Sequence, residues 1–527
     1  MPTTPNAPPA PTDALPCDVL VVGGGINGAG IARDLAGRGW RVVLAEQDDL
    51  AAHTSSASTK LIHGGLRYLE HYEFGLVRKA LQEREVLLRS APHLMGPLAF
   101  VMPHDPDDPS LRPVWLVRLG LFLYDHLARR EVLPGSRAVK LAGTPLGAPL
   151  QARFATGFVY ADGWVDDARL VVACALDAAA RGAQIHTRTA CTAARPVAGR
   201  WQATLTHADG RTQTVQARAL VNAAGPWAAQ MLHKVAAHPG QRHLRLVKGS
   251  HIVVHRRFGH DHAYLFQNPD KRIVFAIPYQ QHFTLIGTTD QEWHGDARLV
   301  SIDDGEIAYL CEQANRFLAQ PVRPEDVVWC YAGVRPLLDD AAGDPAAVTR
   351  DYLLEAHRSD APLLTVWGGK ITTFRKLAEQ AGDQIGHLLG ERRAAWTHGA
   401  LLPGGDLSAW IGAPQRPDAD FARFVVALVT RHPWLPAPLA QRWARAYGSR
   451  VAELLGDATG LADLGDAVAP GLHVAELRFL QRTEWAQDGN DVLWRRSKLG
   501  LHLSPDQRQC VTAWMAANTH PHHHQET

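Results

Sequence analysis

Short apolar runs alternate with a longer helix-length stretch near the start of the chain. Residues 19–22 and 42–44 are continuous runs of valine and leucine, the pattern of central parallel strands that are buried on both faces. A glycine turn and an amphipathic stretch lie between them. This pattern predicts a strand–helix–strand unit at residues 17–47, as expected at the start of a dinucleotide-binding α/β domain.

Two later regions repeat an apolar run that ends in glycine. Residues 219–228 predict a buried strand that ends at Gly225. Residues 363–382 predict a strand, a glycine pair and then a helix, in which the hydroxyls of Thr372 and Thr373 would cap the N-terminus. Three separate segments of the chain therefore carry a strand followed by a glycine turn.

The remaining pattern predicts two further kinds of structure. Between residues 241 and 330, strand-like stretches such as HIVVH, RIVFAIP and FTLIGTT are separated by short polar turns, which predicts an antiparallel sheet. After a linker at 401–407 the pattern is helical. We therefore expect an α/β protein: a Rossmann-like domain interleaved with an antiparallel-sheet domain, followed by a C-terminal helical domain.

Two helices and one acidic pair need separate interpretation. Residues 66–88 predict an amphipathic helix directly after the glycine pair at 64–65. Residues 112–130 are apolar almost all round but too short and too charged to span a bilayer, so that helix is either buried, which we favour for most of it, or lies on a membrane surface. Asp166 and Asp167 resemble paired catalytic carboxylates, but before an apolar helix we interpret them as N-terminal caps.

The glycine turn carries the first candidate chemistry. Gly23, Gly25 and Gly28 form a GxGxxG motif that follows a strand and opens a helix, so its N–H groups would face a pyrophosphate. Glu46 ends the second strand, eighteen residues after Gly28, where a carboxylate can accept hydrogen bonds from ribose hydroxyls. In this context the motif predicts a dinucleotide site.

The segment after Glu46 favours FAD over NAD. A nicotinamide dehydrogenase would continue with further strand–helix units, whereas this chain enters a hydroxyl-rich segment at 54–59 and a glycine pair at 64–65. Such a segment suits a loop that wraps a long, extended ligand, which the glycine turns near 225 and 369 would meet again. We expect non-covalent FAD, because no cysteine lies in a flavin-tethering motif, although His63 is a conceivable tether.

Composition and charge exclude several other classes. Lys and Arg total 54 against 53 Asp and Glu, a formal charge of +1, so nothing pulls the whole chain toward nucleic acid. The six cysteines form no CxxC pair, which argues against a zinc site and a disulfide framework. No apolar run is long enough to span a membrane. We interpret the first sixteen residues as a disordered lead-in and the terminal HPHHHQET as a frayed polar tail rather than a metal site.

Many motifs together resemble one family. The chain is similar to the FAD-dependent sn-glycerol-3-phosphate dehydrogenases of the bacterial aerobic, respiratory type, within the D-amino-acid-oxidase-like flavoproteins. The matching motifs are GGGINGAGIARDLAGRG, TSSASTKLIHGGLRYLEHYEF, YADGWVDDARLV, KGSHIVV, KRIVFAIPY, IGTTD, YAGVRPL, TRDY, GGKITTFRKLAE and EWAQDGNDVLWRRSKLGL.

The resemblance implies a domain plan. It places the FAD-binding domain in residues 17–100, 150–240 and 330–390, the substrate-binding domain in 101–149 and 241–329, and the helical domain in 400–520. The cofactor-binding residues would be Gly23, Gly25, Ile26, Asn27, Gly28, Glu46, Thr54, Ser55, Ser56, Ser58, Lys60, Leu61, His63, Gly64, Gly65, Ala224, Gly225, Gly369, Lys370, Thr372 and Thr373.

The implied reaction is the oxidation of sn-glycerol 3-phosphate to dihydroxyacetone phosphate, by hydride transfer from C2 to N5 of FAD. Binding the phosphate requires several cations in one pocket, and the C2 oxygen requires a fixed donor. The resemblance assigns Arg335 to the C2 oxygen and makes His63 and His251 the candidates for proton transfer, although His63 could equally hold the loop or the flavin. It assigns the phosphate and its surroundings to Arg67, Tyr68, Arg350 and Lys370.

The resemblance also implies where the electrons go. The acceptor would be a membrane quinone, ubiquinone or menaquinone, and the protein a peripheral enzyme on the cytoplasmic side of the inner membrane or partly in the cytoplasm. We also expect a homodimer and no nucleic-acid partner. Alternatives are an oxidase that uses oxygen, a related FAD-dependent amine or 2-hydroxy-acid oxidoreductase, and a non-catalytic flavoprotein.

Overall fold

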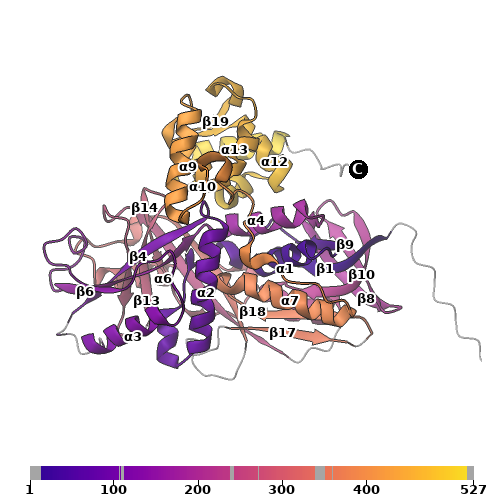
Figure 1. Ribbon diagram of the computed structural model, residues 1–527, viewed down its shortest axis with the longest axis horizontal. Helices are drawn as coiled ribbons and strands as arrows, with labels where there is room; N and C mark the ends of the chain where they lie inside the picture. Colours follow the sequence, from indigo (N-terminus) through magenta and orange to yellow (C-terminus); the bar gives the residue numbers. More distant parts are fainter. Residues whose placement is uncertain are drawn as a thin grey trace, which may run out of the picture.

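The computed structural model describes residues 14–105, 107, 112–237, 242–270, 272–338, 351–358 and 360–518, apart from the side chains of Arg67, Glu70 and His71. Residues 1–13 of the predicted sixteen-residue lead-in, the polar C-terminal tract and Arg350 lie outside the described residues. Leu15 and Pro16 already belong to strand β1, so the lead-in prediction is wrong for these two residues. Within the described part the chain forms two large sheets and a helical C-terminal region (Figure 1).

The first sheet has a parallel centre. Its strands run in the order β17-β18-β10-β1-β2-β7, with β8 and β9 extending it from β10. The strands from β18 to β7 are all parallel to their neighbours, whereas β17 and β9 pair antiparallel. Their bounds are β1 Leu15–Val22, β2 Val42–Ala45, β7 Gln184–His186, β8 Thr189–Val197, β9 Arg200–His207, β10 Thr212–Asn222, β17 Tyr352–His357 and β18 Leu363–Gly368.

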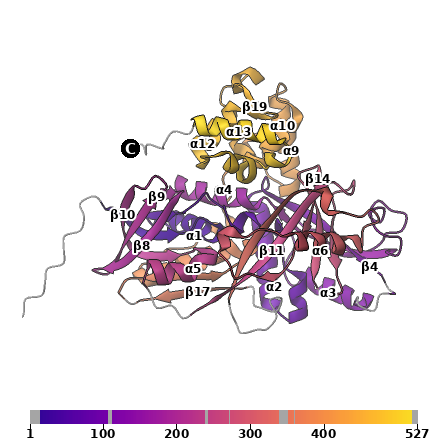
Figure 2. The same ribbon diagram turned by 180° about the vertical axis from the view of Figure 1, so that it is seen from behind.

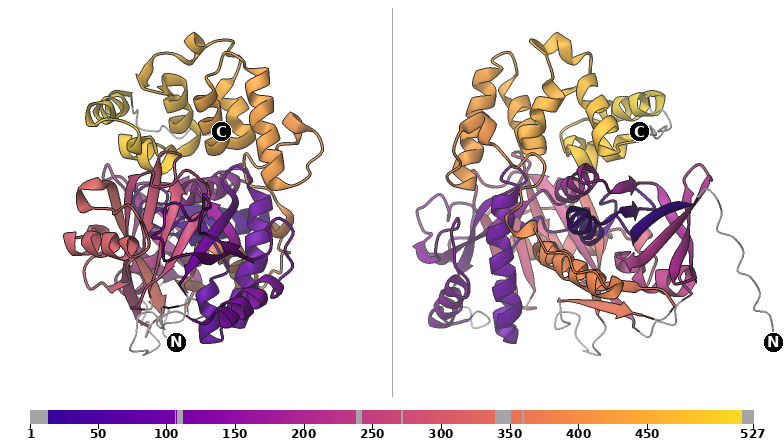
Figure 3. Two further views of the ribbon diagram at one scale, coloured as in Figure 1. Left: turned by 90° about the vertical axis from the view of Figure 1, so that its left-hand side faces the viewer. Right: turned by 45° about the vertical axis from the view of Figure 1, so that its right-hand side comes forward.

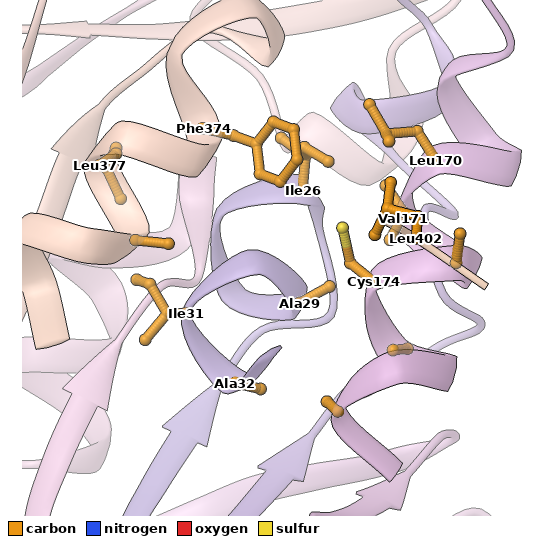
Figure 4. Close-up of a cluster of buried hydrophobic side chains, with 14 of the residues drawn as sticks. Ile26, Ala29, Ile31, Ala32, Leu170, Val171, Cys174, Phe374, Leu377 and Leu402 are labelled. Carbon is orange, nitrogen blue, oxygen red and sulfur yellow. The ribbon is translucent and has the colours of Figure 1, made fainter. Parts of the chain in front are cut away.

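Three helices pack together beside this sheet. They are α1 (Ile26–Gly37), α4 (Asp167–Ala180) and α7 (Phe374–Leu389). Figure 4 shows small side chains of α1, Ala29 and Ala32, in the cluster that also holds Cys174 of α4 and Phe374 of α7. Small residues on α1 let its neighbours approach closely, which fixes the N-terminus of α1 at the carboxyl end of β1.

The second sheet is mostly antiparallel. Its order is β15-β11-β14-β13-β12-β4-β6-β3, with β16 paired to β11 and β5 paired to β6. Figure 2 shows β11 crossing this part of the molecule beside helix α6 (Asp304–Asn315). The bounds are β3 Leu61–Ile62, β4 Met95–His104, β5 Arg137–Lys140, β6 Thr156–Val165, β11 Leu244–His255, β12 Ala263–Gln267, β13 Ile273–Tyr279, β14 Phe283–Gly287, β15 Gln291–Glu292 and β16 Val327–Leu338.

The C-terminal region has a hydrophobic core of its own, built around residues such as Phe424, Trp443 and Phe479. Figures 1 and 3 show it stacked on one side of the two-sheet body. The expected fold class is thus confirmed, whereas the domain boundaries stay predictions. The elements are α8 Ser408–Ile411, α9 Pro417–Arg431, α10 Ala437–Tyr447, α11 Val451–Leu455, β19 Ala467–Ala469, β20 Leu472–His473, α12 Val474–Glu484, a π-helical turn Asp491–Arg496 and α13 Pro505–Asn518.

Buried ion pairs fasten the C-terminal region to the first sheet. The guanidinium of Arg496 donates to both carboxylate oxygens of Asp49, at 2.6 and 2.8 Å, and Arg495 donates to the same carboxylate at 2.5 Å. Arg169 of α4 pairs with Glu484 of α12, also buried. Because a buried charge is tolerated only when it is paired, these contacts fix how the C-terminal region sits on the loop after β2.

The segment after the glycine pair differs from the expected helix over 66–88. It begins as a 3₁₀ turn, Leu66–His71, and the α-helix α2 starts only at Phe74 and runs to Ser90. Tyr72, between them, has φ +59°, a left-handed conformation that a right-handed helix cannot pass through. The glycine pair and Tyr72 therefore separate a short polar turn from the long helix.

The structure also corrects the prediction that the helix within 112–130 is mostly buried. Helix α3 spans Val114–His126 and buries Val117, Leu121 and Tyr124. Its other face exposes Trp115 (66%) and Phe122 (55%). Among the described residues, no helix is both long and apolar enough to cross a membrane.

We predict that Arg496→Met destabilises the fold. Removing one partner of a buried ion pair costs about 3–5 kcal/mol, because the Asp49 carboxylate would lose its bidentate partner inside the protein. Thermal denaturation measures the loss. As a control, Arg211→Met removes an exposed ion pair to Asp209 and should change stability by less than about 0.5 kcal/mol. Equal melting temperatures for both variants would contradict the role given to the buried pair.

Candidate active site

The glycine turn between β1 and α1 has no room for side chains. Gly23 has φ +112°, and a Cβ there would overlap the backbone of Ala223. A Cβ on Gly28 would overlap the carbonyl of Gly23. Gly25 is the N-cap of α1 and offers no capping side chain, while the N–H of Ile26 donates to the Ser55 hydroxyl at 2.9 Å. The start of α1 is thus a backbone surface suited to a phosphate.

Glu46 lies at the end of β2, as the sequence predicts. Its carboxylate accepts from the N–H of Gly24 at 2.5 Å and from the N–H of Asp48 at 2.9 Å. Burial raises the pKa of this carboxyl, and the two N–H groups oppose that rise. The carboxylate therefore holds together the glycine turn and the loop that follows β2.

A cavity extends from Glu46 past the start of α1 to the glycine pair after β18. Asn27 lies in its wall, and the buried Asn27 Oδ1 has no hydrogen-bond partner in the described part of the chain. Such an atom calls for a donor from a ligand or water. The predicted residues that line the cavity are Gly23, Gly25, Ile26, Asn27, Glu46, Thr54, Ser55, Ser58, Ala224, Gly225 and Gly369.

The cavity also has walls that the motifs did not single out. His53 and Trp227 meet edge to face, with ring centroids 4.8 Å apart. The loop after β10 and the helical turn that follows it close the same side. Further lining residues come from two segments, 190–191 and 226–235, that carry no cofactor motif. Only the folded structure identifies them as part of the wall. The additional lining residues include Gln47, Ala190, Cys191, Pro226, Gln230, Met231, Val235, Pro336, Gly368 and Ile371.

The other predicted cofactor residues lie outside the lining of this cavity: Gly28, Ser56, Lys60, Leu61, His63, Gly64, Gly65, Lys370, Thr372 and Thr373. Two of them correct the capping prediction. The Thr372 hydroxyl accepts from the backbone N–H of His63 at 3.2 Å, and Thr373 is the N-cap of α7 without a side-chain hydrogen bond. The hydroxyl of Thr372 thus ties the glycine-pair segment to the start of α7.

Asp167 anchors the segment 54–60. Its Oδ2 accepts from the Ser58 hydroxyl and from the Lys60 ammonium, both at 2.7 Å. Burial opposes its ionisation, but the charges of Lys60 and Lys498, together with the hydrogen bonds from Lys60 and Ser58, lower the pKa of Asp167. Burial also lowers the pKa of Lys60 to about 8. Asp166 is the N-cap of α4, as predicted, whereas Asp167 serves this ion pair instead of capping.

Arg335 and His251 lie on the paired strands β16 and β11. Arg335 forms an ion pair with Asp290 and donates to the Thr288 hydroxyl at 3.0 Å. His251 stacks on Tyr331, with centroids 4.8 Å apart, and its Nε2 lies 3.0 Å from the Thr59 hydroxyl. Burial, together with the charges of Arg335 and Lys60, keeps the pKa of His251 well below its usual value, so the ring is neutral at pH 7.

Lys370 and Tyr68 form a second pair. The ammonium lies 3.8 Å from the centroid of the Tyr68 ring, a cation–π contact. Lys370 stands between Gly369 and Ile371, which line the cavity, and Arg335 precedes Pro336, which lines it too. Two of the predicted cations are thus sequence neighbours of lining residues, although neither Arg335 nor Lys370 is itself part of the lining. The side chain of Arg67 and the whole of Arg350 lie outside the described residues.

Comparison with known proteins identifies the class. The sequence pattern of the FAD-dependent oxidoreductase family matches residues 18–375, and the chain belongs to that family. It is 50% identical over 521 residues to a glycerol-3-phosphate dehydrogenase of Pseudomonas aeruginosa, with 98% of each chain covered. It is 49% identical to a D-erythritol 1-phosphate dehydrogenase of Brucella abortus, with 94% of this chain and 97% of the relative covered.

A solved structure agrees in fold and cofactor. The glycerol-3-phosphate dehydrogenase of Bacillus halodurans, complexed with FAD, superposes with a TM-score of 0.75 at 26% identity, covering 95% of this chain and 90% of that one. The present protein is therefore an FAD-dependent enzyme, and its cavity fits the cofactor. Glycines allow close approach, the N-terminus of α1 suits a pyrophosphate, and Glu46 lies in the cavity wall, where a carboxylate can bind ribose hydroxyls.

We predict that Glu46→Ala weakens FAD binding. A hydrogen bond to a charged group contributes about 1.5–3 kcal/mol, so losing this carboxylate should raise the dissociation constant of FAD by about tenfold or more. The flavin-to-protein absorbance ratio after gel filtration, and fluorescence titration of the apoprotein with FAD, measure it. Glu391→Ala, at an exposed carboxylate, serves as control. Unchanged FAD affinity in Glu46→Ala would exclude this residue from the cofactor site.

Proposed function

We propose that the protein oxidises sn-glycerol 3-phosphate at C2 to dihydroxyacetone phosphate. The observation that carries the proposal is that Arg335 and Lys370 each stand next in sequence to a residue that lines the cavity, Pro336 and Gly369, in a chain of nearly neutral charge. A phosphate monoester needs such concentrated positive charge, and arginine matches its geometry. The high identity to the Pseudomonas aeruginosa enzyme supports the same substrate.

The phosphate would bind to the cations of the glycine-pair segment and of the turn that follows β18. The Lys370 ammonium lies over the face of the Tyr68 ring, a cation–π contact that orients it. Arg67 is the neighbour of Tyr68 in sequence, and we assign it and Arg350 to the same phosphate. Several cations around one dianion would place C2 beside the cofactor.

Arg335 and a histidine would handle the C2 hydroxyl. When bound, FAD supplies the acceptor for the hydride that leaves C2. The hydroxyl proton must go to a base, and a neutral imidazole can accept it. We assign this role to His251, because its buried ring is neutral at pH 7 and lies on β11, which pairs with the strand that carries Arg335. The guanidinium of Arg335 would stabilise negative charge that develops on the C2 oxygen.

A second substrate deserves a direct comparison. The 49% identity to the D-erythritol 1-phosphate dehydrogenase of Brucella abortus is nearly as high as that to the glycerol-3-phosphate enzyme. Both named substrates are polyol phosphates, so both need a phosphate site and an alcohol to be oxidised. They differ in chain length, which the cations alone do not distinguish.

The electron acceptor would be a membrane quinone, and α3 the surface that meets the membrane. Trp115, Leu119 and Phe122 are exposed on one face of this helix, and Arg118 is exposed beside them. An apolar, aromatic face with basic flanks is the pattern of a helix that lies in a lipid interface. Figures 1 and 2 place α3 on the side of the body away from the C-terminal region, so that region would not block contact.

We predict that glycerol 3-phosphate bleaches the flavin. In anaerobic mixing with the purified FAD-loaded protein, loss of the oxidised-flavin absorbance reports substrate oxidation without any acceptor. D-erythritol 1-phosphate and glycine are the comparison compounds, and we expect slower bleaching by the first and none by the second. Faster bleaching by D-erythritol 1-phosphate would favour that substrate, and bleaching by glycine alone would overturn the proposal.

We predict that the double variant Trp115→Asn, Phe122→Asn releases the protein from lipid. Each large apolar side chain buried in a membrane contributes about 1.5–3 kcal/mol, so cosedimentation with anionic vesicles should fall by at least about tenfold. Reoxidation of the reduced protein by a short-chain quinone in detergent should not change. Val426→Asn, at an equally exposed apolar residue on α9, is the control. Vesicle binding that survives the double variant would place the membrane surface elsewhere.

A further inference from the structure

A buried polar cluster lies beneath the glycine pair, away from the cofactor cavity. It consists of Arg84 on α2, Tyr124 on α3 and Asp162 on β6, each only 2% exposed. Arg84 donates to Asp162 Oδ1 at 2.6 Å, and the Tyr124 hydroxyl donates to the same carboxylate at 2.9 Å. A buried ion pair with a tyrosine hydroxyl costs desolvation energy that an apolar cluster would avoid, so its retention needs a reason.

The cluster makes a specific contact with the active-site segment. The backbone N–H of Gly64 donates to the Tyr124 hydroxyl at 2.9 Å and more weakly to Asp162 Oδ1 at 3.4 Å. A Cβ on residue 64 would lie 2.7 Å from the Tyr124 hydroxyl and 2.5 Å from a methyl of Leu81. The glycine therefore lets the backbone sit directly on the hydroxyl, which fixes the height and orientation of the peptide.

The residues after Gly64 connect it by direct contacts to Lys370, a proposed phosphate ligand. Gly65 has φ +78°, and its Cα faces the Tyr68 ring so closely that a side chain at residue 65 would overlap the ring. The Tyr68 ring also contacts the Lys370 ammonium, which lies 3.8 Å from the ring centroid. A continuous set of contacts thus runs from Arg84 and Asp162 through Tyr124, the glycine pair and Tyr68 to Lys370.

We propose that Tyr124 is a positioning residue of the enzyme: its hydroxyl fixes Gly64 and thereby sets the position of the Tyr68–Lys370 pair. Asp162 and Arg84 orient that hydroxyl, because the carboxylate accepts its proton and leaves the oxygen lone pairs to the N–H of Gly64. Tyr124 is not among the residues that line the cavity, so its effect on substrate would be indirect. The inference rests on the proposed binding of a polyol phosphate at Lys370.

Tyr124→Phe tests the proposal, because it removes the hydroxyl and keeps the ring. We expect the KM for glycerol 3-phosphate to rise about five- to tenfold, the effect of one lost hydrogen bond, while kcat changes less than about twofold. FAD content and melting temperature should stay close to those of the parent. Amide hydrogen exchange in a peptide spanning 61–70 of the FAD-loaded protein should become faster.

The matched control is Tyr160→Phe. Tyr160 is buried beside Tyr124, with ring centroids 6.1 Å apart, so the variant removes a hydroxyl next to the cluster and leaves the bond to Gly64. A split between KM and kcat that appears in Tyr124→Phe alone supports positioning. Equal changes in both variants, or an unchanged KM in Tyr124→Phe, would overturn it.

The proposed function and the positioning role can fail separately. If no polyol phosphate bleaches the parent flavin, the proposed function fails. Hydrogen exchange over residues 61–70 still reports whether the Tyr124 hydroxyl fixes the glycine pair. Unchanged exchange at 61–70 in Tyr124→Phe would overturn positioning whatever the substrate. If folding of Tyr124→Phe is impaired, Asp162→Asn replaces it: the weakened orientation of the hydroxyl should again raise KM more than it lowers kcat, and an equal loss in both would overturn the proposal.

Discussion

The candidate site depends most on one interaction, the buried ion pair between the Asp167 carboxylate and the Lys60 ammonium. A charge taken out of water must be paired, and Asp167 meets this requirement with the Ser58 hydroxyl and the Lys60 ammonium. This pairing holds the polar segment 54–60 in place between the two sheets. From that position Thr54 donates to the carbonyl of Val334 on β16, and Ser58 lies in the wall of the cavity. One ion pair thus positions the segment that both sheets share.

The same segment links the cofactor side to the proposed substrate side. Thr59 contacts His251, the peptide of His63 is held by Thr372, and Gly64 rests on Tyr124. Each bond pairs a polar group of the segment with another part of the chain. The segment therefore joins the wall of the cavity to β11 and to the start of α7, beside the residues that we propose for the substrate.

The sequence pattern predicted those elements whose conformation depends on residues close together in the chain. The apolar runs predicted β1, β2 and β18, and the glycine spacing predicted the turn before α1, because crowding within that turn excludes side chains at Gly23 and Gly28. The part of the site on those turns, with Glu46 at the end of β2, could be predicted in the same way. The cavity wall around His53 and Trp227 could not, since it forms only when distant segments pack.

Long-range pairing explains the remaining differences. Asp167 has the sequence position of a helix cap, but its partners come from a segment more than a hundred residues earlier. Helix α2 starts later than predicted, because Tyr72 adopts a left-handed conformation that the neighbouring sequence does not predict. Helix α3 is apolar on both faces, and only the packing of Tyr124 and Leu121 decides which face is buried and which carries Trp115 outward.

The most direct test of the account is the rate at which glycerol 3-phosphate reduces the flavin in Arg335→Ala, measured by anaerobic rapid mixing. Arg335→Lys keeps a charge opposite Asp290 and separates loss of charge from loss of the guanidinium. The account predicts full FAD content and a rate at saturating substrate that falls about 10²- to 10³-fold in Arg335→Ala, because a fixed donor to the C2 oxygen is gone. A rate close to that of the parent protein would contradict it.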